Sequence, residues 1–312
     1  MKKIAYLFPG QGSQKVGMGQ DLYQASDDVK ALFAAADQVS GLPISRLCFE
    51  GPMDALTQTV NLQPAITVVN LACLSALEKK GLRPQVCAGH SLGEYSALYA
   101  AGVVSAADCI RLVHKRGQLM HREATRNQGA MSAIVGLSID QLKPLVAEAS
   151  GKSIVAVANH NSADQVVITG EPAAVQAAGE AAAAAGARAV PLKVSGAWHS
   201  PLIQGAEDEF RTFLEGIAFQ APKCPVIHNV TADACDAPDR IKSLLARQLC
   251  SPVRWYDSML KMVADGVEVF VEIGPGKVLA GLLKKVLPAG GGVKVYNVQD
   301  LKSANAFLSE EA

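Results

Sequence analysis

The sequence QVCAGHSLGEYSALYAA at residues 85–101 contains a short apolar run, a glycine-rich turn around a serine, and a stretch of helix-forming residues. We expect a strand over 85–88, a tight turn over 89–93 and a helix over 94–101, an order typical of α/β sheets. The turn fits Gly-x-Ser-x-Gly, in which glycines allow the strand and helix to approach closely and the serine hydroxyl stays exposed at the helix N-terminus. We therefore predict that Ser91 is a nucleophile, the alternative being a serine that only caps the helix.

Similar elements lie before and after this stretch. The apolar run at 4–8 ends at Pro9 and indicates a buried strand, as does VEVFVEI at 267–273, and 64–80 is typical of a helix. The GPGK that follows the last strand lacks the spacing of a Walker A loop, which argues against a phosphate-binding loop. Together these segments predict a large domain of the α/β class.

The middle of the chain has a different order of elements. The order is strand, helix, strand, strand, helix, strand, which matches the ferredoxin-like unit. We therefore predict an α/β catalytic domain built from 1–126 and 195–312, with a small domain inserted at 127–194. The segments on which this rests are strands at 130–137, 153–158, 165–169 and 188–194 and helices at 139–149 and 172–185.

The composition gives no support for several classes of protein. The 312 residues include 29 Lys and Arg and 29 Asp and Glu, so the net charge of zero gives no case for nucleic-acid or acidic-membrane binding. The seven cysteines include no C-x-x-C pair and fit reduced, mostly buried thiols. The N-terminal run is too short for a signal peptide, and we find no apolar stretch of about 18 residues, the length of a membrane span. We expect a cytoplasmic enzyme.

A nucleophilic serine needs a base, and the chain contains six histidines. His199 lies in VSGAWHSP at 194–201, where the chain returns from the small domain to the large one, and this placement suits a cleft. On these grounds His199 is favoured while the other five remain open. These are His90, which neighbours Ser91 on a tight turn, His114 and His121, which fall on the polar side of their helix, His160, in the Asn-rich turn NHNS, and His228, at the end of a strand.

Arg116 breaks the pattern of its helix, which we predict over 105–123. The apolar stripe of this helix contains Cys109, Leu112, Val113, Leu119 and Met120, and Arg116 projects from the middle of it. A guanidinium directed inward keeps its charge and needs an anionic partner. The partner is either an internal Asp or Glu or the carboxylate of a substrate held by a bidentate clamp. In the second case the transferred acyl group has a free carboxylate.

Seven motifs now identify a resemblance that covers nearly the whole chain. They resemble malonyl-CoA:acyl-carrier-protein transacylases in their order and spacing. That family joins an α/β-hydrolase-like domain to a ferredoxin-like insert, in agreement with the elements above. The motifs are FPGQGSQ at 8–14, GHSLGEYSAL at 89–98, R-G-x-x-M at 116–120, NHNS at 159–162, GAWHSP at 196–201, RQLCSPVRW at 247–255 and EIGPGKVL at 272–279.

The resemblance implies a role for each site residue. Ser91 is the nucleophile and His199 the general base, and Arg116 pairs with the malonyl carboxylate. The backbone N–H groups of Gln11 and Leu92 form the oxyanion hole, where charge develops in the tetrahedral intermediate. The family orients its histidine by a main-chain carbonyl, here that of Gln248, so a Ser-His dyad is expected in place of a triad.

The implied reaction is a ping-pong transfer of malonyl from CoA to Ser91 and then to the phosphopantetheine thiol of acyl carrier protein. We expect no metal or other cofactor, and a monomer. Trp198 precedes the base at a position that correlates with acyl selectivity in related acyltransferases. Its bulk would exclude an α-methyl branch and so favour malonyl over methylmalonyl, the alternative being ordinary core packing. Asn159 and Asn161 are candidate substrate contacts from the small domain.

Other functions remain open on the sequence alone. A serine thioesterase would share the nucleophile and base but pass the acyl group to water. A malonyltransferase acting in trans for a polyketide synthase or a malonate decarboxylase would keep the chemistry and change the pathway. A non-catalytic subunit that binds carrier protein would have no need for the set Ser91, His199 and Arg116. We expect the malonyl group to feed fatty-acid chain elongation.

Overall fold

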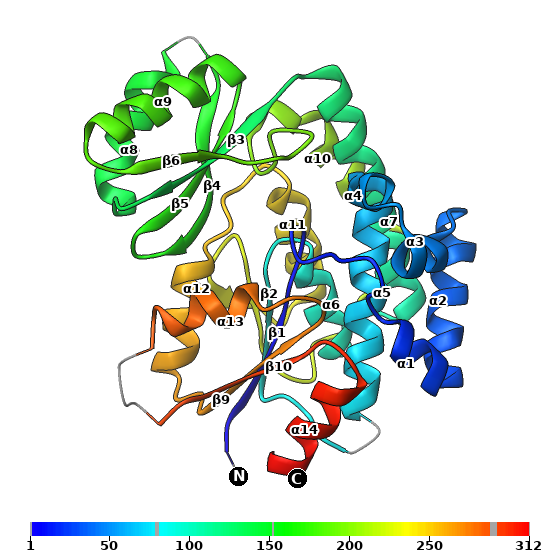
Figure 1. Ribbon diagram of the computed structural model, residues 1–312. Coiled ribbons are helices and arrows are strands. Elements are labelled where there is room, and N and C mark those ends of the chain that lie inside the picture. The colour runs from blue at the N-terminus through cyan, green and yellow to red at the C-terminus, as the bar shows by residue number, and fades with distance from the viewer. Residues whose placement is uncertain (1, 79–80, 152, 288–291, 312) are drawn as a thin grey trace.

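A six-stranded sheet forms the centre of the larger part of the computed structural model, which describes residues 2–78, 81–151, 153–287 and 292–311 (Figure 1). Its strand order is β10-β9-β1-β2-β7-β8, and all neighbours are parallel except β7 and β8. The central strands are buried on both faces, which explains their continuous apolar sequences. The strands are β1 (Ile4–Phe8), β2 (Val86–Gly89), β7 (Val226–His228), β8 (Asp233–Ala234), β9 (Val269–Ile273) and β10 (Lys294–Val298).

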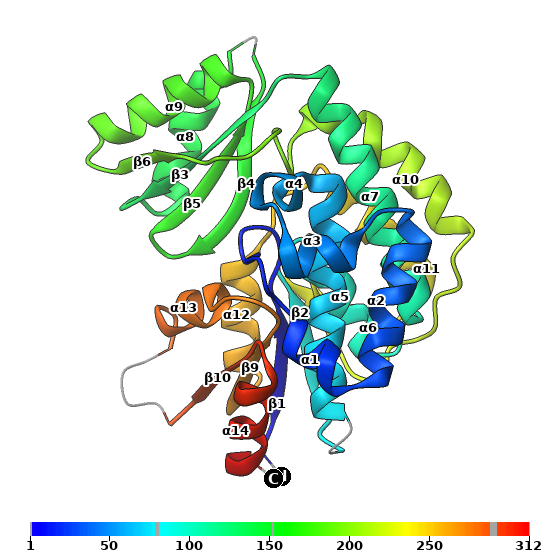
Figure 2. The ribbon, with the colours of Figure 1, turned by 45° about the vertical axis from the view of Figure 1, so that its right-hand side comes forward.

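Helices cover both faces of this sheet (Figures 1 and 2). On β1, Tyr6 and Phe8 point into one core while Ala5 and Leu7 point into the other, as the alternation of a strand requires. The second core lies under α12 (Trp255–Ala264) and α13 (Val278–Lys284). The helices of the first core are α1 (Gln20–Ala25), α2 (Asp27–Ser40), α3 (Ile44–Glu50), α4 (Met53–Thr57), α5 (Thr59–Glu78), α6 (Gly93–Ala100), α7 (Ala106–Arg126), α10 (Gly205–Glu215), α11 (Pro238–Gln248) and α14 (Leu301–Glu311).

Helix α5 is the central helix of the first core. By length and mean hydropathy alone it could cross a membrane, although polar residues such as Asn70 interrupt its apolar run. Of its most apolar window, 78% is buried inside the protein. Such burial is typical of a core helix of a globular domain.

The small domain is a four-stranded antiparallel sheet of order β4-β5-β3-β6. One face packs on its two helices, and the other turns toward Met120, Trp198 and Ile203 of the large domain. The α/β class with a ferredoxin-like insert is thereby confirmed, and the strands lie within the predicted limits of 127–194. The elements are β3 (Ala130–Val135), α8 (Ile139–Ser150), β4 (Val155–Ser162), β5 (Gln165–Gly170), α9 (Pro172–Ala184) and β6 (Arg188–Pro191), and a 3₁₀ turn at Pro201–Ile203 follows the domain.

The structure corrects three predicted elements. The motif NHNS at 159–162 belongs to β4 and is not a turn, because β4 pairs with β5 to its end and with Val253 at Asn159. Strand β6 ends at Pro191, three residues before the predicted end. Helix α5 begins at Thr59, five residues before the predicted start, and contains Pro64. The predicted end of that helix at 79–80 lies outside the described residues.

Candidate active site

Ser91 lies at the sharp turn between β2 and α6, with φ of 50°. The glycines on either side of it make the turn possible. A Cβ at Gly89 would lie 2.0 Å from the carbonyl carbon of Gly93, and a Cβ at Gly93 would lie 1.9 Å from the carbonyl oxygen of Phe8. Both distances are far below van der Waals contact, so side chains at these positions would separate helix, turn and strand.

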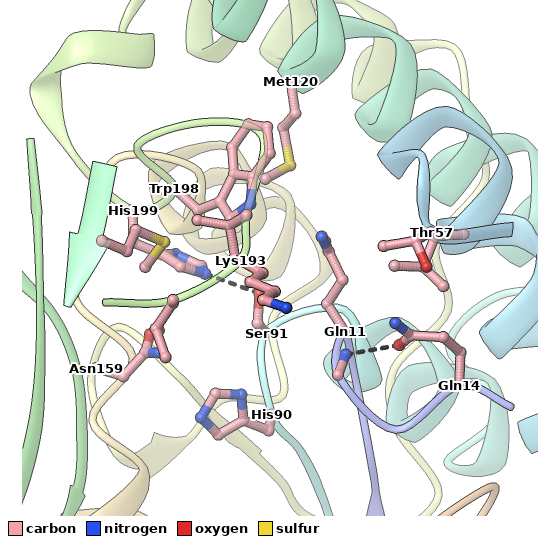
Figure 3. Close-up of a pocket in the computed structure, with 15 residues that line it drawn as sticks. Gln11, Gln14, Thr57, His90, Ser91, Met120, Asn159, Lys193, Trp198 and His199 are labelled. Atoms are coloured by element: carbon pink, nitrogen blue, oxygen red, sulfur yellow. Dashed lines mark hydrogen bonds between the residues drawn. The ribbon is translucent and has the colours of Figure 1, made fainter. Parts of the chain in front are cut away.

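His199 lies directly beside this serine. Its Nε2 is 2.8 Å from Oγ of Ser91 (Figure 3). Its Nδ1 is 2.8 Å from the backbone carbonyl oxygen of Gln248 at the end of α11. Since the carbonyl can only accept, Nδ1–H donates to it and Nε2 is left to accept the serine proton. His199 has φ of 60°, so both residues of the pair adopt the left-handed conformation that non-glycine residues rarely adopt.

The surroundings of His199 keep its imidazole neutral. Burial and the positive charge of Arg116 lower the pKa of His199 to about 3, and burial is the larger cause. A histidine with this pKa is unprotonated at neutral pH and can accept a proton.

Arg116 of α7 is a buried cation, 1% exposed, with neutral hydrogen-bond partners. Nη1 donates to Oε1 of Gln63 at 3.0 Å, and Nη2 donates to Oγ of Ser91 at 3.0 Å and to Oε1 of Gln248 at 3.2 Å. Its guanidinium also lies 5.6 Å from the centre of the Tyr95 ring.

An internal ion pair is not what holds Arg116. Within the described ranges no carboxylate oxygen lies within 4.0 Å of its guanidinium, and its Nε–H has no hydrogen-bond partner. Burial lowers the pKa of Arg116, while Tyr95 and Glu94 act in the opposite direction. A guanidinium placed in this way attracts an anion strongly.

The predicted oxyanion donors lie on two loops that pack together. A Cβ at Gly10 would be 2.6 Å from the carbonyl oxygen of His90 and 3.5 Å from the backbone nitrogen of Leu92, so the loop that contains Gln11 lies against the nucleophile turn. In the turns and loops that the structure describes, the N–H groups of Gln11 and Leu92 donate to no backbone carbonyl. Their role in holding the oxyanion remains a prediction.

A cavity of about 330 Å³ opens at the Ser91–His199 pair, between the two domains (Figure 3). Met131, Asn159 and Leu192 of the small domain and Trp198 of the large domain line this cavity, and Gln11 lies on the other side of Ser91 from Asn159. Arg116 does not line this cavity. Its guanidinium lies behind Ser91, which does line the cavity and accepts a hydrogen bond from it.

Trp198 is both a cavity-lining and a core residue, and its role in acyl selectivity remains a prediction. It lines the cavity beside Met120, and with 5% of its surface exposed it also packs in the core cluster that contains Met131 (Figure 3). Its Nε1–H is buried without a partner among the described residues.

The other candidates take different positions. His90 turns away from the pair, and its Nε2 lies 2.9 Å from Oδ1 of Asn161, so Asn161 binds the turn while Asn159 lines the cavity. His228 lies 2.7 Å from Glu94 in the interior. The remaining three, His114, His121 and His160, make no hydrogen bond with Ser91 in the described structure.

Sequence reasoning missed four residues that hold the site. Asn229 accepts the Ser91 backbone N–H at 2.6 Å and donates to the Gly89 carbonyl at 2.7 Å. The others are Gln63, Glu94 and His228. Asn229 could have been found, because it follows the strand next to β2 and the carboxyl ends of parallel strands meet at one edge of a sheet.

Comparison with known proteins gives one consistent result. Residues 5–305 match the family model described as an acyl transferase domain. The chain is 42% identical over 313 residues to the malonyl CoA-acyl carrier protein transacylase of Bacillus subtilis strain 168, covering 100% of this chain and 99% of the relative.

Two solved structures agree with this. An acyl carrier protein S-malonyltransferase from Vibrio cholerae has a TM-score of 0.92 and 44% identity, covering 98% of this chain and 99% of that one. A malonyl-transacylase solved in complex with a type II polyketide synthase acyl-carrier protein has a TM-score of 0.94 and 41% identity, covering 99% of this chain and 100% of that one.

Proposed function

The chain belongs to the malonyl-CoA:acyl-carrier-protein transacylase family, and we propose that Ser91, His199 and Arg116 perform its transfer of malonyl from CoA to acyl carrier protein. The observation that carries this assignment is the Ser91 hydroxyl, which lies 2.8 Å from Nε2 of His199 and 3.0 Å from Nη2 of Arg116. One oxygen thus contacts both a neutral base and a buried cation. This arrangement suits attack on an acyl group that ends in a carboxylate.

In the first half-reaction, Nε2 of His199 takes the proton of Ser91 while Oγ attacks the carbonyl carbon of malonyl-CoA. The N–H groups of Gln11 and Leu92 hold the resulting oxyanion. The carbon–sulfur bond then breaks, and the CoA sulfur leaves with the proton from His199. In the second half-reaction the phosphopantetheine thiol gives its proton to His199 and its sulfur attacks the carbonyl carbon of malonyl-Ser91. The ester bond between that carbon and Oγ then breaks, and Oγ takes the proton back from His199, which restores the free serine.

The substrate carboxylate also acts on the base. Arg116 lowers the pKa of His199, and an anion on Arg116 would offset this effect. Binding of malonyl therefore makes His199 a stronger base at the moment when Ser91 is attacked. The Gln248 carbonyl fixes the imidazole tautomer in place of the acid of a triad and adds no negative charge.

We also propose that the malonyl group feeds fatty-acid chain elongation and that the protein acts as a cytoplasmic monomer without a metal or other cofactor. A thioester is reactive enough for transfer by a serine, a base and backbone donors. The complex with a polyketide synthase carrier supports the alternative pathway, because it shows that a relative of this chain binds such a carrier. Rates of malonyl transfer to holo-carriers from both pathways would distinguish the two.

Intact mass spectrometry tests the proposed function. Malonyl-CoA should add one malonyl group to the wild-type protein, and holo acyl carrier protein should remove it and become malonylated. Ser91→Ala should carry no adduct. A serine thioesterase would instead release free malonate within the time of the measurement, and an adduct that persists on Ser91→Ala would refute the assignment of the nucleophile.

A further inference from the structure

Glu94 is a buried carboxylate in the first turn of α6, 1% exposed and three residues beyond the nucleophile. Its Oε2 accepts hydrogen bonds from Nε2 of Gln248 at 2.6 Å and from the backbone N–H of Asn229 at 3.2 Å, and its Oε1 lies 2.7 Å from Nδ1 of His228. No Lys or Arg nitrogen of the described residues lies within 4.0 Å of it. Burial of a carboxylate costs free energy unless its lone pairs have donors, and these three donors occupy three of its four lone-pair sites.

Gln248 links this carboxylate to the reacting groups. Its Nε2 donates to Glu94 and to the backbone carbonyl oxygen of Ser91 at 3.1 Å, so both amide hydrogens have acceptors. Its Oε1 then faces Arg116 at 3.2 Å, and its backbone carbonyl holds His199 at 2.8 Å. The two ends of an amide are similar in shape, and their orientation is decided by the donors and acceptors around them. Three groups favour this orientation: Glu94 and the Ser91 carbonyl accept from the nitrogen, and Arg116 donates to the oxygen.

We propose that Glu94 is a positioning residue that sets the malonyl selectivity of the site through Gln248, an inference that rests on the proposed function. Its carboxylate, together with the Ser91 carbonyl, holds the Gln248 amide so that Arg116 meets an oxygen and not a second N–H donor. Its negative charge also stabilises the buried guanidinium, although the Gln248 side chain lies between the two groups. In agreement, Glu94 raises the pKa of Arg116.

The Gln248 amide keeps the Glu94 carboxylate out of direct contact with Arg116. A carboxylate in direct contact with Arg116 would form a strong bidentate pair and compete with the carboxylate of the substrate. An amide oxygen holds the guanidinium in place but leaves its charge available. The chain thus places Arg116, a neutral amide and a buried carboxylate in series behind Ser91.

The substitution Glu94→Gln tests this arrangement because it keeps the shape and removes the charge. An amide at position 94 removes the negative charge behind Gln248 and weakens the acceptor that, together with the Ser91 carbonyl, holds its Nε2. The ratio of kcat/KM for malonyl-CoA over acetyl-CoA should fall at least about tenfold, a loss of about 1.4 kcal/mol of selective transition-state stabilisation. Glu94→Asp, which retains the charge, should keep most of the ratio. A wild-type ratio in Glu94→Gln would overturn the proposal.

A matched control separates selectivity from stability. Glu272 is a second buried carboxylate, on β9, and it accepts the backbone N–H groups of Leu279 and Ala280 at 3.0 and 2.8 Å. Glu272→Gln should lower the free energy of unfolding without changing the ratio of malonyl to acetyl. If Glu94→Gln lowers both rates equally, as a purely structural role requires, the proposal is wrong.

The exchange Glu94→Gln/Gln248→Glu tests the order of the groups. It conserves the net charge but puts the carboxylate directly on Arg116, so malonyl preference should be lost even though the charge is present. Preference retained in the exchange would overturn the role of the intervening amide. Two measurements on the wild type test the proposed function separately: labelling of Ser91 by an uncharged fluorophosphonate and formation of the malonyl adduct. If neither occurs, the proposed function is wrong, whatever the Glu94 variants do.

Discussion

Arg116 donates a hydrogen bond from Nη2 to the Ser91 hydroxyl oxygen at 3.0 Å, so the cation of the site is bound to the nucleophile itself. The guanidinium has only neutral partners in the described structure and does not line the cavity. A malonyl carboxylate can accept from the Nε–H, which has no partner among the described residues, or replace one of these neutral acceptors. Because an ionic hydrogen bond is about twice as strong as a neutral one, either contact favours the charged acyl group over an uncharged one.

Substitution Arg116→Ala should remove the selectivity for a charged acyl group. We expect kcat/KM for malonyl-CoA to fall by about 100-fold or more, the value of a lost charge-assisted pair of about 3 kcal/mol. Acetyl-CoA makes no such pair, so its relative rate should rise. The measurement is the acylation rate of Ser91 with each ester, read by intact mass. An unchanged ratio of the two rates would remove Arg116 from the substrate site.

The pH dependence of Ser91 reactivity follows from the pKa of His199. Only the neutral imidazole can accept the serine proton, and burial together with Arg116 lowers its pKa to about 3. Labelling by an uncharged sulfonyl fluoride should therefore not slow as the pH falls through 6.5, the ordinary pKa of histidine. Arg116→Ala removes the positive charge beside His199, so the pKa of His199 should rise. Labelling of this variant should therefore begin to slow at a higher pH than labelling of the wild type.

The direction of this shift is the critical outcome. Removal of a neighbouring positive charge favours the protonated imidazole, whereas burial, the larger cause, is unchanged, so the variant should titrate between the wild-type value and 6.5. Identical pH profiles in wild type and variant would show that Arg116 does not act on His199. The uncharged probe is necessary because the phosphates of CoA titrate in the same range.

Substitution of Gly93 in the nucleophile turn should destabilise the protein. The added methyl in Gly93→Ala would lie 1.9 Å from the carbonyl oxygen of Phe8, so α6 and β1 must separate. The free energy of unfolding should fall by about 3 kcal/mol or more, at or above the upper end of the usual cost of overpacking. Urea denaturation followed by circular dichroism measures this change, and insoluble expression would be the more severe form of the same result.

Gly281→Ala serves as the control for this substitution. Gly281 lies inside α13, and a Cβ there meets no atom within 4 Å. Alanine at this position should stabilise the protein by about 0.5–1 kcal/mol, since glycine is unfavourable inside a helix. Equal unfolding midpoints for the two variants would contradict the packing argument.

The sequence was informative where the chemistry depends on residues that are near one another along the chain. The glycines around Ser91 predicted the turn, and the apolar stripe around Arg116 predicted a buried guanidinium. Each of these signals lies within a single element, a turn in one case and a helix in the other. The loop where the chain returns to the large domain favoured His199 among six histidines, and the family resemblance decided the choice, because no local pattern places it 108 positions away beside Ser91.

The supporting residues could not be predicted in this way. Asn229 binds Ser91 across 138 positions, and Gln248 binds Glu94 across 154. These contacts depend on the order of parallel strands, which places β7 next to β2 although they are far apart in sequence. The motif NHNS was misread for a related reason, since its composition favours a turn while pairing with β5 and Val253 holds it in a strand.

The position of Trp198 predicts discrimination against branched acyl groups. Its side chain lines the cavity beside Met120 and, at 5% exposure, has little room to move (Figure 3). An α-methyl group on the bound acyl chain should meet this wall, so the wild-type protein should be acylated faster by malonyl-CoA than by methylmalonyl-CoA. Competition between the two esters for Ser91, measured by intact mass at short times, gives the ratio directly.

Substitution of the tryptophan should reduce that ratio. Trp198→Phe keeps an aromatic ring in the core cluster with Met131 and makes the wall smaller, so methylmalonyl should gain about tenfold relative to malonyl, the size expected for one methyl group in a fitted pocket. Met259→Leu, a change in the core on the far face of the sheet, should leave the ratio unchanged. Equal acylation of the wild type by both esters would show that Trp198 serves packing alone.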